Sequence, residues 1–124
     1  MRTILKDLIQ LLKEAGFAKG ISPTGRNKNK YTITVITTLD DQQIRGTIAG
    51  ATLNVRREII VILRYPGTNN PDKEIEQLGK QDEIIASFYN YAEGNIIFTN
   101  AEMTEISEEI LNEIRFTYFD KITL

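Results

Sequence analysis

Glu58-Ile59-Ile60-Val61-Ile62-Leu63-Arg64-Tyr65-Pro66-Gly67 is the stretch of sequence that decides the fold. Its first eight residues form an almost continuous β-branched, apolar run with charges near the ends, which is typical of a strand buried on both faces. Proline has no amide to donate to a ladder and glycine tolerates turn conformations, so Pro66-Gly67 predicts the end of the strand. We therefore expect residues 58–65 to form the central strand of a sheet.

A helix is expected directly after this strand, over residues 70–91. Asn70 is a favourable N-cap and Pro71 suits the first helical position. Asp72 and Glu74 place negative charge in the first turn, where the helix dipole favours it. Helical spacing predicts a buried face made of Ile75, Leu78, Ile85 and Phe88.

A first amphipathic helix is predicted over residues 3–15, because apolar residues recur there at helical spacing. Gly16 is the expected stop. If Gly16 adopts the left-handed conformation, Leu12 and Phe17 fall at the two positions that touch in a Schellman cap.

The segment between this helix and residue 39 divides into a loop and a strand. Residues 20–30 contain Pro23, Gly25 and the basic run Arg26-Asn27-Lys28-Asn29-Lys30, which indicate a loop. The loop is either a solvated connection or a basic arm that contacts a nucleic-acid backbone or an acidic partner. Residues 31–39 are rich in Thr, Ile and Val and predict a strand, with Tyr31, Ile33, Val35 and Thr37 on one face.

The remaining segments are less regular. Residues 42–55 carry Gly46 and Gly50 among apolar residues and suit an irregular arm that leads into the central strand. A short strand is expected at 96–99, followed by a solvent-facing acidic connection at 102–109 and a last strand at 110–119. The acidic segment also offers oxygen ligands that a divalent cation accepts, although no metal site is assigned there.

Taken in order, these elements predict a single α+β domain over residues 1–124. We expect two layers: a mixed or antiparallel sheet of about four strands, with two α-helices packed on one face. If Ile59, Val61 and Leu63 lie under the helices, Ile60 and Ile62 point the other way, where no third helix is available. Either the 42–55 arm or another subunit then covers them, because soluble monomers seldom leave a large apolar patch in water.

The composition weighs against catalysis. The chain has no cysteine and no histidine, which removes thiol chemistry, thiolate metal sites and the commonest general base. We expect no enzyme activity, no cofactor and no metal; the enzyme alternative needs a carboxylate pair, for example among Asp82, Glu83 and Glu93. No apolar run reaches the length of a membrane span, so an intracellular, soluble chain without a membrane partner is expected.

Charge is unevenly distributed along the chain. Residues 1–30 carry seven Lys or Arg and two acidic residues, whereas residues 31–124 carry eight Lys or Arg and fifteen acidic residues. Solvated surface is one explanation. The other is a subunit whose basic end meets the acidic body of its neighbour, through Arg26, Lys28, Lys30, Glu105 and Glu109. Ile60 and Ile62 are candidate interface residues for the separate reason that no helix is available to cover their face.

The order and character of these segments resemble the phage tail terminator, or tail completion, proteins. The resemblance is carried by the amphipathic helix at 3–15, the Thr/Ile/Val strand at 31–39, the segment from Arg56 through Pro66-Gly67 to Leu78, and the strand at 111–119. The acidic 102–109 segment has no counterpart in that pattern.

This resemblance implies a non-enzymatic virion protein whose subunits join head to tail in a closed ring, expected to be hexameric, at the junction of tail and head. The implied partners are further copies of the chain, the tail-tube protein, the head connector proteins and the genome DNA that passes through the channel. Before assembly the protein is expected in the cytoplasm of the bacterial host. The alternative function is a small nucleic-acid-binding or inhibitory module that uses the basic 26–30 loop, and its DNA binding should fall steeply with salt.

Overall fold

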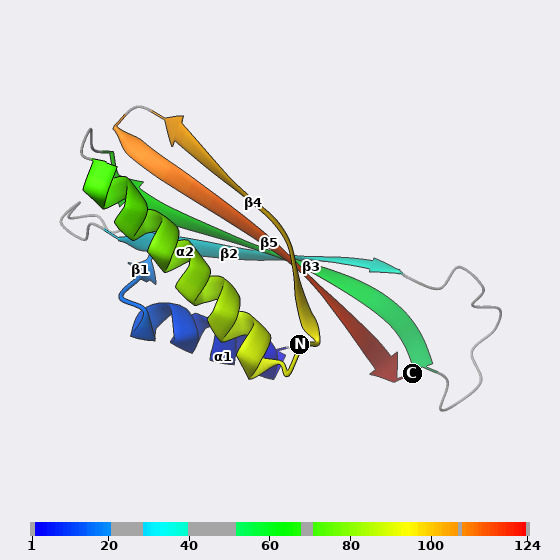
Figure 1. Ribbon diagram of the computed structural model, residues 1–124. Helices are drawn as coiled ribbons and strands as arrows, with labels where there is room; N and C mark the ends of the chain where they lie inside the picture. Colours follow the sequence, from blue (N-terminus) through cyan, green and yellow to red (C-terminus); the bar gives the residue numbers. More distant parts are fainter. Residues whose placement is uncertain (1, 21–28, 40–51, 68–70, 107, 124) are drawn as a thin grey trace.

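The fold is a two-layer α+β arrangement, seen in a computed structural model that describes residues 2–20, 29–39, 52–67, 71–106 and 108–123. Both helices lie on one face of a single sheet (Figure 1). The sheet has five strands in these residues, one more than the sequence predicts. The elements in chain order are α1 (Arg2–Glu14), β1 (Ala18–Lys19), β2 (Lys30–Leu39), β3 (Thr52–Pro66), α2 (Pro71–Tyr91), β4 (Ile96–Ile106) and β5 (Glu109–Thr123).

The strand order is β1-β2-β3-β5-β4, so the predicted central strand does lie in the middle of the sheet. β3 pairs antiparallel with β2 on one side and with β5 on the other, while the two-residue β1 is parallel to β2. β3 begins at Thr52, earlier than expected, so residues 52–55 belong to the central strand and the prediction of an irregular arm is wrong there. The rest of the predicted arm lies outside the described residues.

Alternation along β3 separates its two faces as predicted. Ile59, Val61 and Leu63 are fully buried beneath the helices, whereas Ile60 and Ile62 face the opposite side and are half-buried. β2 follows the same alternation, with Tyr31 buried and Ile33 and Val35 packed against the core. The core cluster consists of Leu8, Leu12, Phe17, Tyr31, Ile59, Val61, Leu63, Tyr65, Ile84, Phe88, Ile96, Ile114 and Phe116.

The end of α1 confirms the predicted Schellman cap. Gly16 has φ 95°, a conformation that glycine adopts without a Cβ clash. The amide of Phe17 donates to the carbonyl of Leu12 at 3.1 Å, and the amide of Gly16 donates to that of Lys13 at 3.0 Å. Leu12 and Phe17 are both in the core cluster, so the cap also directs the chain into the sheet layer.

The Pro66-Gly67 turn is a point of close backbone approach. β3 ends at Pro66, and the Gly67 amide donates to the carbonyl of Glu108 in the turn between β4 and β5. A Cβ at position 67 would lie 2.7 Å from that carbonyl oxygen, which leaves room only for glycine. The turn therefore fixes the end of the central strand against the β4–β5 hairpin.

The predicted buried face of α2 is wrong at its N-terminal half. Ile75 and Leu78 are 66% and 46% exposed, whereas Gln77 and Ile84 are buried. Beneath α2, the sheet presents the fully buried Asn112 of β5. Its Oδ1 accepts a hydrogen bond from Gln81 Nε2 at 2.6 Å. A polar residue on the sheet therefore binds Gln81 of this helix, and Leu78 faces solvent. The predicted N-cap, Asn70, lies outside the described residues.

The prediction that the acidic segment at 102–109 connects two elements is wrong for most of its residues. β4 runs from Ile96 to Ile106, well beyond the predicted short strand, and β5 begins at Glu109 and continues to Thr123. The ladder between them is interrupted by one bulge between Phe98 and Asn100. Most of the acidic segment is thus edge strand, and its solvent exposure on both faces explains why its composition is polar.

Candidate subunit interface

The face of the sheet opposite the helices is the first feature of the candidate interface. Cross-strand register places Thr34, Ile60 and Arg115 in one row of this face. Among the described residues no helix or strand covers it (Figure 1). The predicted orientation of Ile60 and Ile62 is therefore confirmed. Further exposed apolar side chains that the register places on this face are Ile36, Ile97 and Phe119.

Charged side chains also lie on this face, where they form ion pairs with one another. Arg115 donates from Nη1 to Glu58 Oε1 at 2.8 Å and from Nη2 to Glu113 Oε1 at 2.7 Å. The hydrogen bonds to Glu113 and Glu58 raise the pKa of the Arg115 guanidinium above its usual value. The face is accordingly mixed, with isoleucines beside a paired charge cluster, a composition found in interfaces whose subunits also exist apart.

This charge cluster is not predicted from the sequence, although two of its three members can be recognised there. Glu113 and Arg115 are two residues apart in a predicted strand and so share a face. The third member, Glu58, is 57 positions away from Arg115. Its place beside Arg115 follows only from the register of β3 against β5.

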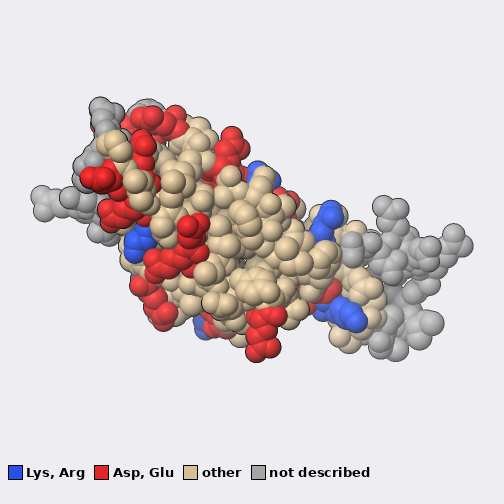
Figure 2. All heavy atoms as spheres, in the orientation of Figure 1, with Lys and Arg blue, Asp and Glu red and all other residues tan. Residues whose placement is uncertain are grey.

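The predicted interface charges lie at opposite sides of the sheet. Lys30 begins β2 opposite Ala18 of β1, and Lys19 follows opposite Tyr31, while Glu105 lies in β4 at the other edge. Glu109 begins β5 next to β4 and is exposed. Arg26 and Lys28 lie outside the described residues. Figure 2 shows acidic side chains gathered over the half of the molecule that holds α2 and the β4–β5 turn.

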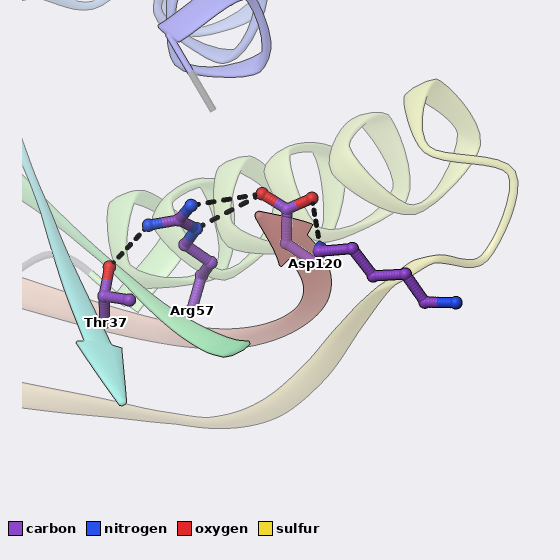
Figure 3. A network of polar contacts seen from close by, with 4 residues as sticks. Thr37, Arg57 and Asp120 are labelled. Carbon is purple, nitrogen blue, oxygen red and sulfur yellow. Dashed lines mark hydrogen bonds and ion pairs between the residues drawn. The ribbon is translucent and has the colours of Figure 1, made fainter. Parts of the chain in front are cut away.

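A second polar network holds together the three strands that extend past the helices. Arg57 donates from Nε and Nη2 to Asp120 Oδ2, each at 3.3 Å, and from Nη1 to Thr37 Oγ1 at 2.7 Å (Figure 3). The side chains of Arg57 and Asp120 are only 14% and 20% exposed. These bonds link β2, β3 and β5, so the network supports the extension where the helices do not.

We expect Arg57→Ala to lower the free energy of unfolding by about 1–2 kcal/mol, because it removes hydrogen bonds to a largely buried carboxylate. Urea unfolding monitored by circular dichroism measures the loss. Arg56→Ala is the matched control, since Arg56 is the neighbouring residue, is exposed and should change stability by less than about 0.5 kcal/mol. Equal losses in the two variants would contradict a structural role for the network.

A hollow of about 290 Å³ lies where the start of α1, the end of α2 and the start of β4 meet. Beside it, the hydroxyl of Tyr91 donates to Asp7 Oδ2 and ties α2 to α1. Of the three carboxylates considered for an enzyme, only Glu93 lines the hollow; Asp82 and Glu83 are exposed on α2. The lining residues are Ile4, Tyr91, Ala92, Glu93, Asn95, Ile96 and Tyr118.

Stability should fall at alkaline pH because of this contact. The hydrogen bond to Asp7 raises the pKa of Tyr91 to about 12, from an ordinary value of 10.0. Above pH 10.0 the unfolded chain loses this proton while the folded chain retains it, so folding stability declines as pH rises towards 12. Denaturant unfolding at a series of alkaline pH values measures the decline. Tyr91→Phe should decline less steeply; an unchanged slope would contradict the assignment.

Comparison with protein-family models and with curated proteins finds no match for this chain. Neither described helix combines the length and apolar composition needed to cross a membrane. Within the part of the chain that the structure describes, no three carboxylate side chains gather in a way that would hold a metal ion.

Proposed function

We propose that this protein is a structural subunit of a phage or prophage virion, which forms a ring that caps the tail tube and joins tail to head. The support comes from the resemblance in element order and from the two-layer α+β architecture. Because fold alone does not establish function, the proposal rests on a surface feature as well.

The observation that carries the proposal is the open sheet face with Ile60 and Ile62 at its centre. In an antiparallel sheet of a soluble monomer, the face away from the core is normally polar. Here it combines isoleucines, the exposed Phe119 and a paired charge cluster. Such a face suits a contact with another subunit or with the adjoining ring of a tail.

The charge distribution suits a head-to-tail contact. A heterologous interface joins two different patches, and ring closure requires these patches to lie on different sides of the subunit. Lys19 and Lys30 lie towards one edge of the sheet and Glu102 and Glu105 at the other. The proposed partners are further copies of this chain, the tail-tube protein and the head connector proteins, with genome DNA passing through the channel.

The mass of the assembled protein tests the proposal directly. Native mass spectrometry across a range of concentration and salt, with negative-stain images of large species, should give a closed ring of about six subunits. A strict monomer, both alone and with purified tail tubes, would overturn the proposal. A monomer that binds DNA with a steep salt dependence would instead favour the nucleic-acid alternative.

Ring formation should also depend on the predicted charges. We expect Lys30→Glu to weaken assembly roughly fivefold at low salt, which corresponds to one surface charge pair, and Glu105→Lys in the same chain to restore it. Raised salt should reduce the difference between the variants by screening. Native mass spectrometry of the single and double variants provides the measurement; a double variant that is weaker than either single variant would contradict this pairing.

A further inference from the structure

The two edges of the sheet are unlike each other, and this difference indicates how copies join. β1 pairs only with Lys30 and Tyr31, so within the described residues no strand lies beside β2 from Thr32 to Leu39. This eight-residue stretch has no charge and no proline, and its register with β3 is uninterrupted. Exposed edges of this kind accept further strands unless charges, prolines or bulges protect them.

The backbone at this edge is directed outward. The amide of Gly20 donates to the carbonyl of Tyr31, which shows that the backbone groups of Tyr31 point away from β3. Alternate residues of a strand point the same way, so Ile33, Val35 and Thr37 present their amides and carbonyls at the open edge. A strand laid alongside would find a ready set of donors and acceptors.

The strand at the opposite edge of the sheet, β4, runs in the direction that antiparallel pairing with β2 of another copy requires. β2, β3, β5 and β4 are successive antiparallel neighbours, so the two outer strands of this set run in opposite directions. When a second copy is placed beside the first in the same orientation, its β4 therefore runs antiparallel to β2. The helices of both copies then lie on the same face of the combined sheet, as a ring built by rotation requires.

The charged residues near the ends of β2 and β4 also favour antiparallel pairing of these two strands. Antiparallel pairing brings the C-terminal end of β4, with Glu105, to the N-terminal end of β2, where Lys30 and Lys19 lie. Parallel pairing would place Glu105 beside the uncharged residues that end β2. Pairing of two β4 edges would bring Glu102 and Glu105 of one copy close to those of the other, which is unfavourable.

We infer that the open edge of β2 binds β4 of a second copy of this chain by antiparallel strand addition, so that one sheet continues from subunit to subunit. The occupant is the neighbour in the proposed ring, and this inference rests on the proposed function. Backbone hydrogen bonds hold the contact, and the lysines and glutamates set its direction.

Engineered cysteines test the inference, since the natural chain has none. Thr104 of β4 is changed to Cys together with Thr32, Thr34 or Thr38 of β2, giving three double variants whose altered side chains all lie on the helix-free face. Within one chain Thr104 is three strands away from β2, about 14 Å, too far for a disulfide. Any disulfide between these positions must join two subunits.

Mild oxidation followed by non-reducing electrophoresis should give a ladder of covalent oligomers for the Thr32 or Thr34 double variant and not for the Thr38 variant. The single-cysteine proteins are the controls. Covalent dimers of Thr34→Cys alone would overturn the inference in favour of two-fold pairing of β2. A Thr38 ladder would overturn the antiparallel direction.

The same samples separate this inference from the proposed function. Rings seen by native mass spectrometry without any covalent ladder would overturn strand addition and leave the ring proposal standing. A ladder that never closes into a ring would support strand addition and count against the terminator function. Absence of both rings and ladder would overturn the two together.

Discussion

Phe88→Ala should lower the free energy of unfolding by about 3–5 kcal/mol, the range for truncating a fully buried aromatic residue. Phe88 has no exposed surface, and its ring lies 4.8 Å from that of Phe116, measured between centroids. This contact joins α2 to the centre of β5, and Phe116 also meets Phe98 of β4 edge to face. Truncation therefore leaves a cavity where the helix layer and the sheet meet.

Urea unfolding at equilibrium measures this loss, with the slope of the transition as a check that cooperativity is retained. Tyr89→Ala is the matched control, because the adjacent Tyr89 is 55% exposed on the same helix. We expect the control to change stability by less than about 0.5 kcal/mol. A loss below about 1 kcal/mol for Phe88→Ala would mean that α2 does not pack on the sheet as described.

Ile60→Glu should abolish ring formation while leaving the monomer folded. The substitution places a charge at the centre of the open sheet face, where burial against a partner would leave it desolvated. In the free subunit the same charge is tolerable, because Ile60 is half-buried and Arg115 stands directly opposite it in β5. A loss of assembly without a loss of fold is thus the specific signature of a buried contact.

Analytical ultracentrifugation measures assembly and circular dichroism measures the fold of the same sample. Thr3→Glu, which adds the same charge to an exposed position of α1, is the control and should assemble normally. Rings of wild-type mass from a folded Ile60→Glu protein would exclude this face from the interface. Strand addition at the edge of β2 would then remain the only contact proposed between copies.

Sequence alone was sufficient for the features that depend on local chemistry. The β-branched run at 58–65 identified the central strand, and its alternation separated Val61 from Ile62 correctly. The spacing of Leu12, Gly16 and Phe17 predicted the end of α1, because a Schellman cap is defined within one turn of helix. Each of these predictions needs only a few consecutive residues.

The features that were predicted wrongly depend on contacts between distant residues. The apolar pattern of α2 places Ile75 and Leu78 inward, yet Gln77 is buried instead and Gln81 donates a hydrogen bond to the buried Asn112 of the sheet. The extent of β4 was missed because an edge strand exposed on both faces has the composition of a loop. Only its pairing with β5, in which Glu102 lies opposite Glu113 and Ile106 opposite Glu109, identifies that segment as a strand.

For the candidate interface too, the features that depend on local sequence could be predicted and those that depend on distant contacts could not. The orientation of Ile60 and Ile62 follows from alternation and was predicted. The pairing of Arg115 with Glu58, and the placing of Lys30 and Glu105 on opposite sides of the sheet, follow from strand order and register, which the sequence does not reveal.

The pairing of β3 with β5 also has a consequence for how the chain folds. Glu58 and Arg115, which meet across these strands, are separated by 57 positions, and α2 and β4 lie between them in sequence. Closing so long a loop is costly before the contacts that reward it have formed, and such topologies fold in milliseconds to seconds rather than microseconds. During synthesis on the ribosome the central strand emerges well before its partner β5. Until then, one side of its apolar run from Ile59 to Leu63 lacks its final neighbour, and the nascent chain is exposed to aggregation through this unpaired strand.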